Sequence, residues 1–372
     1  MILILGRVIR LRRFMINLFY PYVPKEAIEA VVDVLRSRFI GQGPQVDRFE
    51  KIFCDHFNVK NAVSLNSGTA ALATAYELIG IGPGDEVITT PLTCTATNIE
   101  LLRLGAKLVW ADISPDTLCI DRESVKSKLT SKTKAIVQVH LGGLRAECAD
   151  IQYDTRRIPV VSDAAQALGI FTGDYTCCSF QAIKQITTID GGMLIAPSFA
   201  EAHKAKLLRW FGIDRDKKIA NNWQAYKERK MIFDIEVLGT KRHMNDVAAA
   251  MGVVGIAHYD HVMGVRYEQF SKYKELLSDV RGLRIIDSID NTCWLCTVIV
   301  ERRDDFVKKL FEADIDSNVV QVRNDIYKVF GGKRQDLPVM NELEEKYLSI
   351  PLGPHITMDD VEYICKIIKG GW

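Results

Sequence analysis

A lysine in an apolar segment is the residue of this chain best suited to covalent chemistry. Lys184 lies in SFQAIKQITTIDGGM, between a strand-like run and a Gly-Gly turn, and Ser179 precedes it by five residues. Burial among apolar side chains lowers the pKa of a lysine, and the neutral amine that results can attack a carbonyl carbon. Most lysines are simply solvated, so this segment alone leaves both a catalytic and a surface role open for Lys184.

A second segment has the features of a phosphate-binding site. The strand-like run AVSL at 62–65 leads into Asn66-Ser67-Gly68-Thr69, and an alanine-rich helix follows. Backbone N–H groups at the start of a helix, with hydroxyl groups nearby, bind phosphate well. Ser67 and Thr69 are also typical N-cap residues, and for this segment alone a plain helix cap is the stronger interpretation.

A carboxylate at the end of a predicted strand is the third feature. Asp163 follows the apolar run IPVVS, at the edge where open α/β sheets place their ligands. There it could keep a pyridinium nitrogen protonated and so make an aromatic ring an electron sink. Gln166 lies three residues further on, on the same face if a helix begins at Asp163. The alternative is that Asp163 only caps that helix, and this segment alone favours neither interpretation.

The elements that must position these residues alternate along the chain. Short apolar runs separated by helical stretches predict a mostly parallel sheet covered by helices on both faces. A small-residue helix after this region begins at the Asn-Asp pair of HMNDVAAAMGVVGI, which is a cap candidate. The predicted strands are 62–65, 86–90, 107–113, 135–140 and 158–164, and the predicted helices are 24–37, 44–57 and 200–211.

The C-terminal third has a different pattern and predicts a separate α+β domain. After about residue 265 we expect a helix, a strand at 293–300, another helix and a final amphipathic helix at 357–369. The chain then divides into an N-terminal extension at 1–16, a large domain at 17–250 and a smaller domain at 251–372. We expect residues 1–14 to be disordered or loosely docked, and residues 213–240 to be rich in loops.

The composition excludes several classes of protein. Of the 372 residues, 48 are Lys or Arg and 47 are Asp or Glu, so no overall basic field favours nucleic acid. No apolar run approaches the ~20 residues that span a bilayer. The nine cysteines are expected to be reduced thiols of a cytoplasmic protein. Cys293-x-x-Cys296 has no second pair and lies in a strand-like run, so we expect no metal site.

The order of these motifs resembles that of a known family. The chain is similar to the sugar aminotransferases of the DegT/DnrJ/EryC1/StrS family over about residues 17–369. The resemblance implies the aspartate aminotransferase architecture (fold type I), an α/β fold with a mostly parallel seven-stranded sheet and a smaller C-terminal α+β domain. The ordered matches are GQGPQVDRFE, NSGTAAL, GIGPGDEVITTPLT, SDAAQALG, SFQAIKQITTIDGGM, GTKRHMNDVAAAMG and VRND.

The resemblance implies pyridoxal 5'-phosphate (PLP) as cofactor and gives each residue a role. Lys184 would form a Schiff base with PLP and later move a proton between substrate and cofactor. Asp163 would pair with the pyridine nitrogen, and Gln166 would contact the hydroxyl side of the ring. Lys241, where the family usually has Asn, would reach the phosphate in the neighbouring subunit, which implies a homodimer with shared active sites. The phosphate would otherwise be held by Ser67, Gly68, Thr69 and Ser179.

The same resemblance implies the reaction. L-glutamate would convert PLP to pyridoxamine 5'-phosphate, and a nucleotide-linked keto sugar would then accept the amine. The acceptor is commonly a 4-keto-6-deoxyhexose in this family and sometimes a 3-keto sugar. Arg215 and Arg323 are candidates for binding the donor carboxylate or the nucleotide phosphates, and a surface ion pair is the alternative for each.

The chain also departs from the family pattern. Cys94 occupies the position of the aromatic residue that usually stacks on the PLP ring, and the segments 142–158 and 170–178 are shortened. Related sugar dehydratases replace the Schiff-base lysine, so the presence of Lys184 argues against that activity. A regulatory protein that has kept the fold without catalysis is the remaining alternative.

Overall fold

The computed structural model describes residues 2–4, 7–9, 15–220 and 235–372. Near the N-terminus, β1 (Ile2–Ile4) and β2 (Arg7–Ile9) form a short antiparallel pair. Within the described ranges, no helix is both long enough and apolar enough to cross a membrane.

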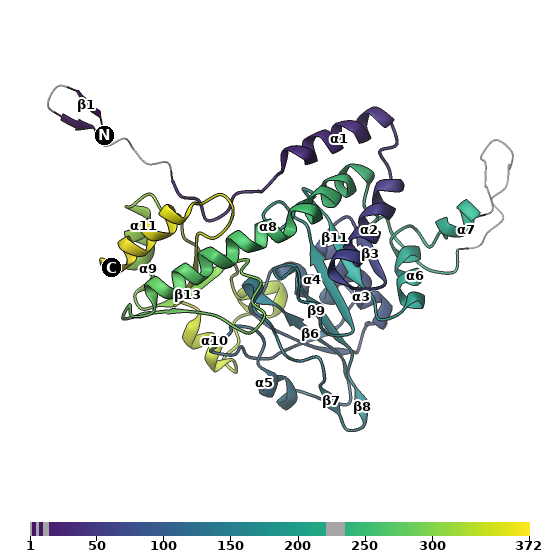
Figure 1. The fold of residues 1–372 in the computed structure, drawn as a ribbon. Coiled ribbons are helices and arrows are strands. Elements are labelled where there is room, and N and C mark those ends of the chain that lie inside the picture. The colour runs from purple at the N-terminus through teal and green to yellow at the C-terminus, as the bar shows by residue number, and fades with distance from the viewer. Residues whose placement is uncertain (1, 5–6, 10–14, 221–234) are drawn as a thin grey trace.

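A seven-stranded sheet forms the centre of the larger unit (Figure 1). Six of its strands run parallel, and only β11 is antiparallel to both of its neighbours. The predicted α/β class with a mostly parallel seven-stranded sheet is therefore confirmed. In spatial order the strands are β3 (Ala62–Leu65), β11 (Gly192–Ile195), β10 (Tyr175–Ser179), β9 (Val160–Asp163), β6 (Thr133–Val139), β4 (Glu86–Thr89) and β5 (Lys107–Trp110).

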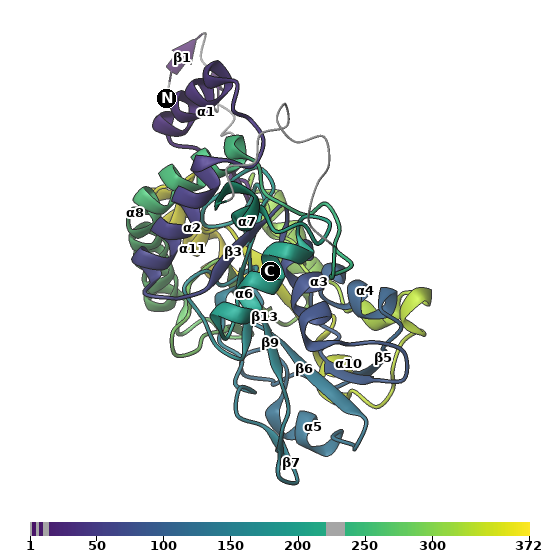
Figure 2. The same ribbon diagram turned by 90° about the vertical axis from the view of Figure 1, so that its right-hand side faces the viewer.

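Apolar side chains cover both faces of this sheet, as a parallel sheet between helices requires. Adjacent strand residues face opposite cores: Cys177 packs on the side of α3 (Gly68–Ile79), and Cys178 on the side of α2 (Pro44–Phe57) and α8 (Asp246–Leu277). Figure 2 shows the sheet between α2 and α8 on one side and α3 and α4 (Thr95–Arg103) on the other. The remaining helices of this region are α1 (Lys25–Ser37), α5 (Arg122–Ser127), α6 (Phe199–Leu208) and α7 (Arg215–Ala220).

The smaller C-terminal unit is built on a three-stranded antiparallel sheet. Its strands are β12 (Leu283–Ile285), β13 (Cys296–Val300) and β14 (Tyr347–Ile350), and its helices are α9 (Arg303–Phe311), α10 (Pro338–Leu343) and α11 (Met358–Lys369). The strand predicted at 293–300 begins only at Cys296, because Cys293 has a left-handed backbone (φ 46°) that interrupts the extended run.

The helix α8 joins the two units. It runs without interruption over 32 residues, so the small-residue helix and the helix expected after about residue 265 are one element, and the proposed boundary at 250/251 falls inside it. One end packs against α1 and α2 and the other against α11 (Figure 1). Gly264 has open space beside it and no positive φ, which explains how the helix passes this residue without a kink.

Two of the family-like motifs bind to each other at the start of α2. The Asp246 carboxylate, in the first turn of α8, accepts hydrogen bonds from the backbone N–H groups of Gly43 (2.8 Å), Gln45 (3.2 Å) and Val46 (3.1 Å). A helix of this kind leaves its first N–H groups unpaired, and Gly43 has no side chain to cap them. Asp246 is itself buried, so the two segments are fixed to each other.

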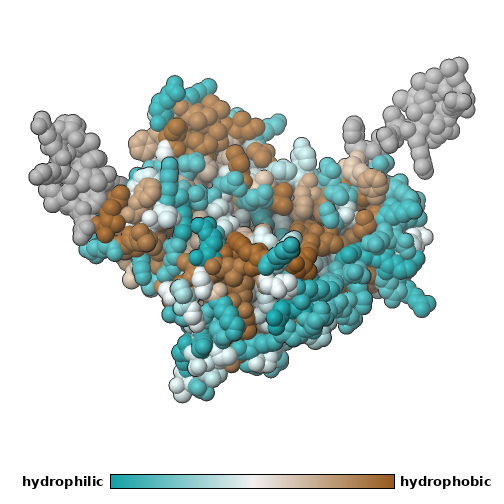
Figure 3. All heavy atoms as spheres, turned by 180° about the vertical axis from the view of Figure 1, so that it is seen from behind, coloured by the Kyte–Doolittle hydropathy of each residue, from teal (hydrophilic) through white to brown (hydrophobic). Residues whose placement is uncertain are grey.

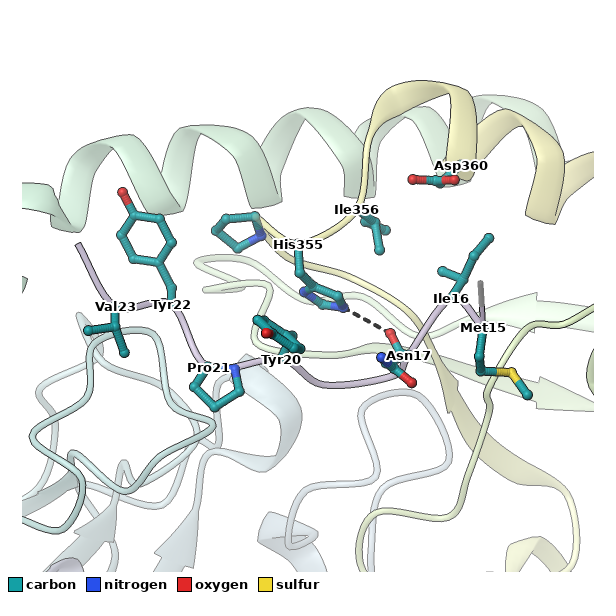
Figure 4. A pocket seen from close by; sticks show the side chains of 11 residues that line it. Met15, Ile16, Asn17, Tyr20, Pro21, Tyr22, Val23, His355, Ile356 and Asp360 are labelled. Carbon is teal, nitrogen blue, oxygen red and sulfur yellow. Dashed lines mark hydrogen bonds between the residues drawn. The ribbon is translucent and has the colours of Figure 1, made fainter. Parts of the chain in front are cut away.

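The segment 15–23 docks on the smaller unit rather than on the large sheet. Ile16 pairs with Ile315, and its carbonyl accepts a hydrogen bond from the N–H of Asp316 (2.9 Å). His355 donates from Nε2 to the carbonyl of Asn17 at 2.8 Å (Figure 4). The chain then leads into α1, which projects from the molecule.

Both shortened segments contain regular structure, and residues 170–178 include most of the buried strand β10. Residues 142–158 contain the short hairpin of β7 (Gln152–Tyr153) and β8 (Arg156–Arg157), preceded by a 3-10 turn, η1 (Leu141–Gly143). Two further 3-10 turns, η2 (Asn324–Ile326) and η3 (Lys328–Phe330), lie in the smaller unit.

Candidate active site

A cavity of about 500 Å³ lies at the carboxyl ends of the parallel strands, between the two units. The large unit supplies the turn after β10, the end of β9 and the start of α3, and the smaller unit supplies the loop 316–321. The structure brings eight of the predicted residues together in its wall: Ser67, Gly68, Thr69, Cys94, Asp163, Gln166, Ser179 and Lys184.

The start of α3 forms a cradle in this wall. Ser67 is the N-cap, and its hydroxyl accepts a hydrogen bond from the N–H of Ala70 at 3.0 Å. The backbone of Gly68 passes so close to Ser179 that a Cβ at position 68 would lie 2.8 Å from the Cβ of Ser179. Glycine is therefore required here, and the helix N–H groups and the Ser179 hydroxyl face one small space that suits a phosphate.

Asp163 ends β9 and is only 4% exposed. Its Oδ2 accepts a hydrogen bond from the Thr97 hydroxyl (2.7 Å) and its Oδ1 one from the N–H of Ala165 (3.0 Å). Because a threonine hydroxyl has one hydrogen to donate, the 2.7 Å contact between Thr93 and Thr97 must run from Thr93 to Thr97. The three side chains thus form a directed chain that ends on the carboxylate.

Burial raises the pKa of Asp163 above its usual range, while Thr97, Ala165 and the Lys184 amine each lower it. A buried carboxylate of this kind favours a cationic partner, because a nearby positive charge stabilises its ionised form. A protonated ring nitrogen meets that requirement. The predicted helix at Asp163 does not form, since residues 165–169 make turns, so the interpretation of Asp163 as a helix cap was wrong.

Gln166 reaches the cavity from the first of these turns and not from a helix. Its Oε1 accepts a hydrogen bond from the N–H of Gly142 at 2.8 Å, and the side chain is almost fully buried. With the oxygen held in this way, the amide nitrogen is the end that can meet a ligand oxygen. This orientation fits a donor to the hydroxyl group of a pyridine ring.

Lys184 lies on the turn after β10, with its N–H bonded to the carbonyl of Gln181. Burial lowers the pKa of its amine from the ordinary value to about 8, although the Asp163 carboxylate and the Cys94 thiol act in the opposite direction. A far larger fraction of the amine is therefore neutral near physiological pH than in a solvated lysine, and the neutral amine is the form that attacks an aldehyde. Its Nζ lies 3.9 Å from the ring centroid of Trp294.

Cys94 lies at the cavity wall immediately before α4, and it is exposed. No aromatic side chain occupies this position, so a ring bound beside Asp163 would meet a thiol there. A thiol gives a smaller and more polarizable contact than an aromatic ring.

Three predicted residues lie elsewhere. Lys241 is exposed and its backbone pairs with Trp210. Arg215 donates to the carbonyl of Gln42 at 3.0 Å. Arg323 is 2% exposed and forms ion pairs with Asp325 (2.6 Å) and Glu344 (2.9 Å). None of the three is among the described residues of the cavity wall.

The sequence interpretation missed several residues that shape the site. Thr93 lies just before the N-cap of α4 and Thr97 in its first turn, and the threonine-rich sequence PLTCTATN before a helix was the available signal. Trp294 and Phe19 line the cavity from distant parts of the chain, and no local pattern indicated them.

A second cavity of about 660 Å³ is lined by residues of the segment 15–23 and by His355 (Figure 4).

A lysine of lowered pKa, a buried carboxylate and a helix-start phosphate cradle define a PLP-dependent aminotransferase in this fold. The residues fit the cofactor: the cradle would hold its phosphate, Asp163 its ring nitrogen and Lys184 its aldehyde carbon. Comparison with known proteins agrees. The DegT/DnrJ/EryC1/StrS aminotransferase family matches residues 21–369, and the chain belongs to this family.

Individual relatives support the same assignment. The chain is 30% identical to a UDP-4-amino-4-deoxy-L-arabinose–oxoglutarate aminotransferase of Shewanella sediminis, covering 94% of this chain and 96% of that protein. The crystal structure of AtS13 from Actinomadura melliaura is 30% identical, with a TM-score of 0.89 over 97% of this chain and 100% of that one. The PLP-form of a putative sugar aminotransferase, Spr1654 from Streptococcus pneumoniae, is 25% identical, with a TM-score of 0.85 over 96% and 98%.

Proposed function

We propose that this enzyme moves the amino group of L-glutamate to a nucleotide-linked keto sugar. The proposed acceptor is a 4-keto-6-deoxyhexose, which would be aminated at C4. The observation that carries the proposal is the pairing of a partly neutral Lys184 with the buried Asp163 in one cavity. When bound, PLP supplies an electron sink that stabilises negative charge at the substrate carbon. The name of the Shewanella sediminis relative pairs oxoglutarate with a UDP-linked sugar that carries its amino group at C4, which supports C4 as the position.

The side chains of the cavity would divide the work. Asp163 would keep the ring nitrogen protonated, and Gln166 would orient the ring through its amide nitrogen. Lys184 would carry the proton between substrate and cofactor, because its pKa of about 8 allows it both to accept and to release a proton near neutral pH. The loop 316–321 faces Lys184 from the smaller unit and is a candidate surface for the sugar.

We infer a homodimer in which the partner completes the site. PLP, glutamate and a nucleotide sugar are all anions, yet Lys184 is the one basic residue among the described residues of the cavity wall, beside Asp163, Asp190 and Asp316. Further cations must come from outside this wall, and the partner's copy of Lys241 is the predicted source. Exposed apolar residues on and after α1, Ile28, Leu35, Phe39 and Ile40, offer a surface for a second copy (Figure 3).

A 3-keto sugar is the alternative acceptor.

A cytoplasmic location is part of the proposal. All nine cysteines are free thiols, which fits a reducing compartment. A regulatory protein without catalysis is disfavoured, because such a protein has no need of a lysine whose pKa is displaced toward neutrality.

The direct test is incubation with L-glutamate and GDP-, dTDP- and UDP-linked 4-keto and 3-keto sugars, followed by mass spectrometry. We expect an aminated product from at least one 4-keto sugar and none with Lys184→Ala. Products from 3-keto sugars alone would favour the alternative. Absence of product from every sugar, with PLP bound, would contradict the proposed reaction and favour a regulatory role.

A further inference from the structure

An aromatic ring from the smaller unit lies directly beneath the amine of Lys184. Trp294 precedes β13 and is 1% exposed, and the Lys184 Nζ is 3.9 Å from the centroid of its ring. A lysine ammonium within about 6 Å of an indole face is attracted by the negative charge density of that face. This contact therefore links the nucleophile of one unit to a side chain of the other.

The ring of Trp294 is held from several directions. Its indole N–H donates to the carbonyl of Ile183, the residue next to Lys184, at 3.0 Å. Phe19, from the segment 15–23, stacks on the indole with a centroid distance of 5.6 Å and an interplanar angle of 28°. The ring position is thus set by the backbone of the lysine turn and by the N-terminal segment together.

The backbone of Trp294 is also fixed. Arg266, on α8, is 6% exposed and donates from Nη1 to the carbonyls of Trp294 (3.0 Å), Leu352 (3.1 Å) and Cys293 (3.3 Å). A buried arginine that binds three carbonyls ties the loop before β13 to the loop after β14. An indole anchored at both its ring and its backbone offers a surface that does not move when the lysine does.

We propose that Trp294 is a positioning residue that holds the amine of Lys184 at the cavity wall whenever this amine is not bonded to the cofactor. This inference rests on the proposed role of Lys184. The proposed role of Lys184 as a proton carrier requires its free amine to stay within reach of the cavity. A fixed aromatic face beside Ile183 limits the flexible four-carbon side chain to positions from which it can return, so less conformational freedom is lost at each step.

The test is the rate at which added PLP becomes bonded to Lys184 in cofactor-free protein, followed by visible absorbance. We expect Trp294→Leu to slow this rate on the order of tenfold, because a misplaced nucleophile reacts slowly. Trp294→Phe keeps an aromatic face and should recover most of the rate. The control is Trp372→Leu, since Trp372 also donates its indole N–H to a carbonyl, that of Glu301 at 2.7 Å, and packs on Phe306, but has no described lysine over its ring.

Two further measurements separate positioning from simple loss of structure. Trp294→Leu should lower kcat for the reaction with glutamate and leave KM for glutamate nearly unchanged. Circular dichroism and thermal unfolding check the fold of each variant. If Trp294→Leu does not fold, Phe19→Leu loosens the same ring while leaving it in place, and it should slow the bonding rate by a smaller factor.

The outcomes distinguish this inference from the proposed function. If wild-type protein shows no lysine-bound cofactor, the role of Lys184 fails and the inference fails with it. If wild type captures PLP and a folded Trp294→Leu captures it at the same rate, only the positioning role is overturned. Equal slowing in Trp294→Leu and Trp294→Phe would also overturn it, since the aromatic face would then be irrelevant.

Discussion

Burial and neighbouring charge set the protonation of the two central residues in opposite senses. Burial lowers the pKa of Lys184 to about 8, which frees the amine, and it raises the pKa of Asp163, which the Thr93–Thr97 hydroxyl chain counteracts. Each group favours the other's charged form, and both face the same cavity. The site is therefore prepared for a ligand that is cationic at one end and electrophilic at the other.

The lowered pKa of Lys184 predicts a specific pH dependence. Only the neutral amine attacks an aldehyde, so the rate at which cofactor-free protein bonds PLP should fall about tenfold per pH unit below pH 8 and become constant above it. Stopped-flow absorbance at a series of pH values measures this rate. A rate that continued to rise from pH 9 to pH 10.5 would indicate an ordinary, solvated lysine.

Asp163→Asn tests the other half of the pair. The amide is of similar shape but carries no charge, so it cannot keep a ring nitrogen protonated. We expect PLP to remain bonded to Lys184 while the rate with glutamate falls on the order of 100-fold or more, the cost of breaking a buried charge pair. The matched control is Asp190→Asn at the exposed rim of the cavity, which should retain most of the activity. Similar rates for both variants would remove Asp163 from the chemistry.

At the scale of elements, the structure depends on contacts between segments far apart in the chain. Asp246 caps α2 from about 200 residues away, with separations of 200, 201 and 203 residues to its three partners. Its substitution by Ala would leave three N–H groups at the start of α2 without their carboxylate. A lost cap costs about 1 kcal/mol, and the loss of three hydrogen bonds to one charged group raises this to about 3 kcal/mol.

We therefore expect Asp246→Ala to lower the midpoint of urea unfolding clearly. Asp121→Ala is the control, because Asp121 caps the short helix α5 through a single bond to the N–H of Ser124 and should cost about 1 kcal/mol. Equal losses of stability in the two variants would contradict a larger stabilising effect of the contact between α2 and α8.

Local sequence patterns predicted the helices and strands well, but not the contacts between elements that are far apart in the chain. The helix predicted at 44–57 is α2 itself, since Pro44 starts it and the left-handed Asn58 ends it. The strand predicted at 62–65 matches β3, because this short apolar run is bounded on both sides by residues that favour turns. The continuity of α8 could not be predicted, because it is fixed by the two units that pack along it and not by its own composition.

In the candidate site, too, local patterns identified single residues but not the contacts between distant segments. Asp163 and the residues around Gly68 were recognisable because they lie at the end of a predicted strand or the start of a predicted helix, and Lys184 because it lies in an apolar segment before a Gly-Gly turn. Trp294 was not, because its contact with the lysine turn joins residues 111 positions apart. Arg323 had the expected residue type, but Asp325 and Glu344 already neutralise it. Its proposed contact with substrate stays a prediction that the geometry of this chain does not favour.

At the scale of the whole molecule, three parts of the chain together form the wall of the cavity. The large sheet supplies Asp163 and Lys184, the smaller unit supplies Trp294 and the loop 316–321, and the segment 15–23 closes the wall with Leu18 and Phe19. The segment is itself held by Ile315 and His355 of the smaller unit. A movement of the smaller unit would therefore change the surroundings of Lys184 directly.

The proposed dimer can be tested by complementation between two inactive chains. Lys184→Ala lacks the nucleophile, and Lys241→Ala should lack the partner's contact to the phosphate, so each homodimer should have little activity. In a mixed dimer, one site combines Lys184 of the second variant with Lys241 of the first and is intact. Co-expression at equal levels should thus recover about a quarter of wild-type activity, since half of the dimers are mixed and half of their sites are complete.

The size of this recovery depends on which chain supplies Lys241. If Lys241 acted within its own chain, every site of the mixed dimer would lack one lysine and co-expression would recover nothing. If the protein were a monomer, mixing would likewise have no effect, and gel filtration would show it directly. Because Lys241 is exposed and absent from the described cavity wall of its own chain, we expect the recovery and a dimer.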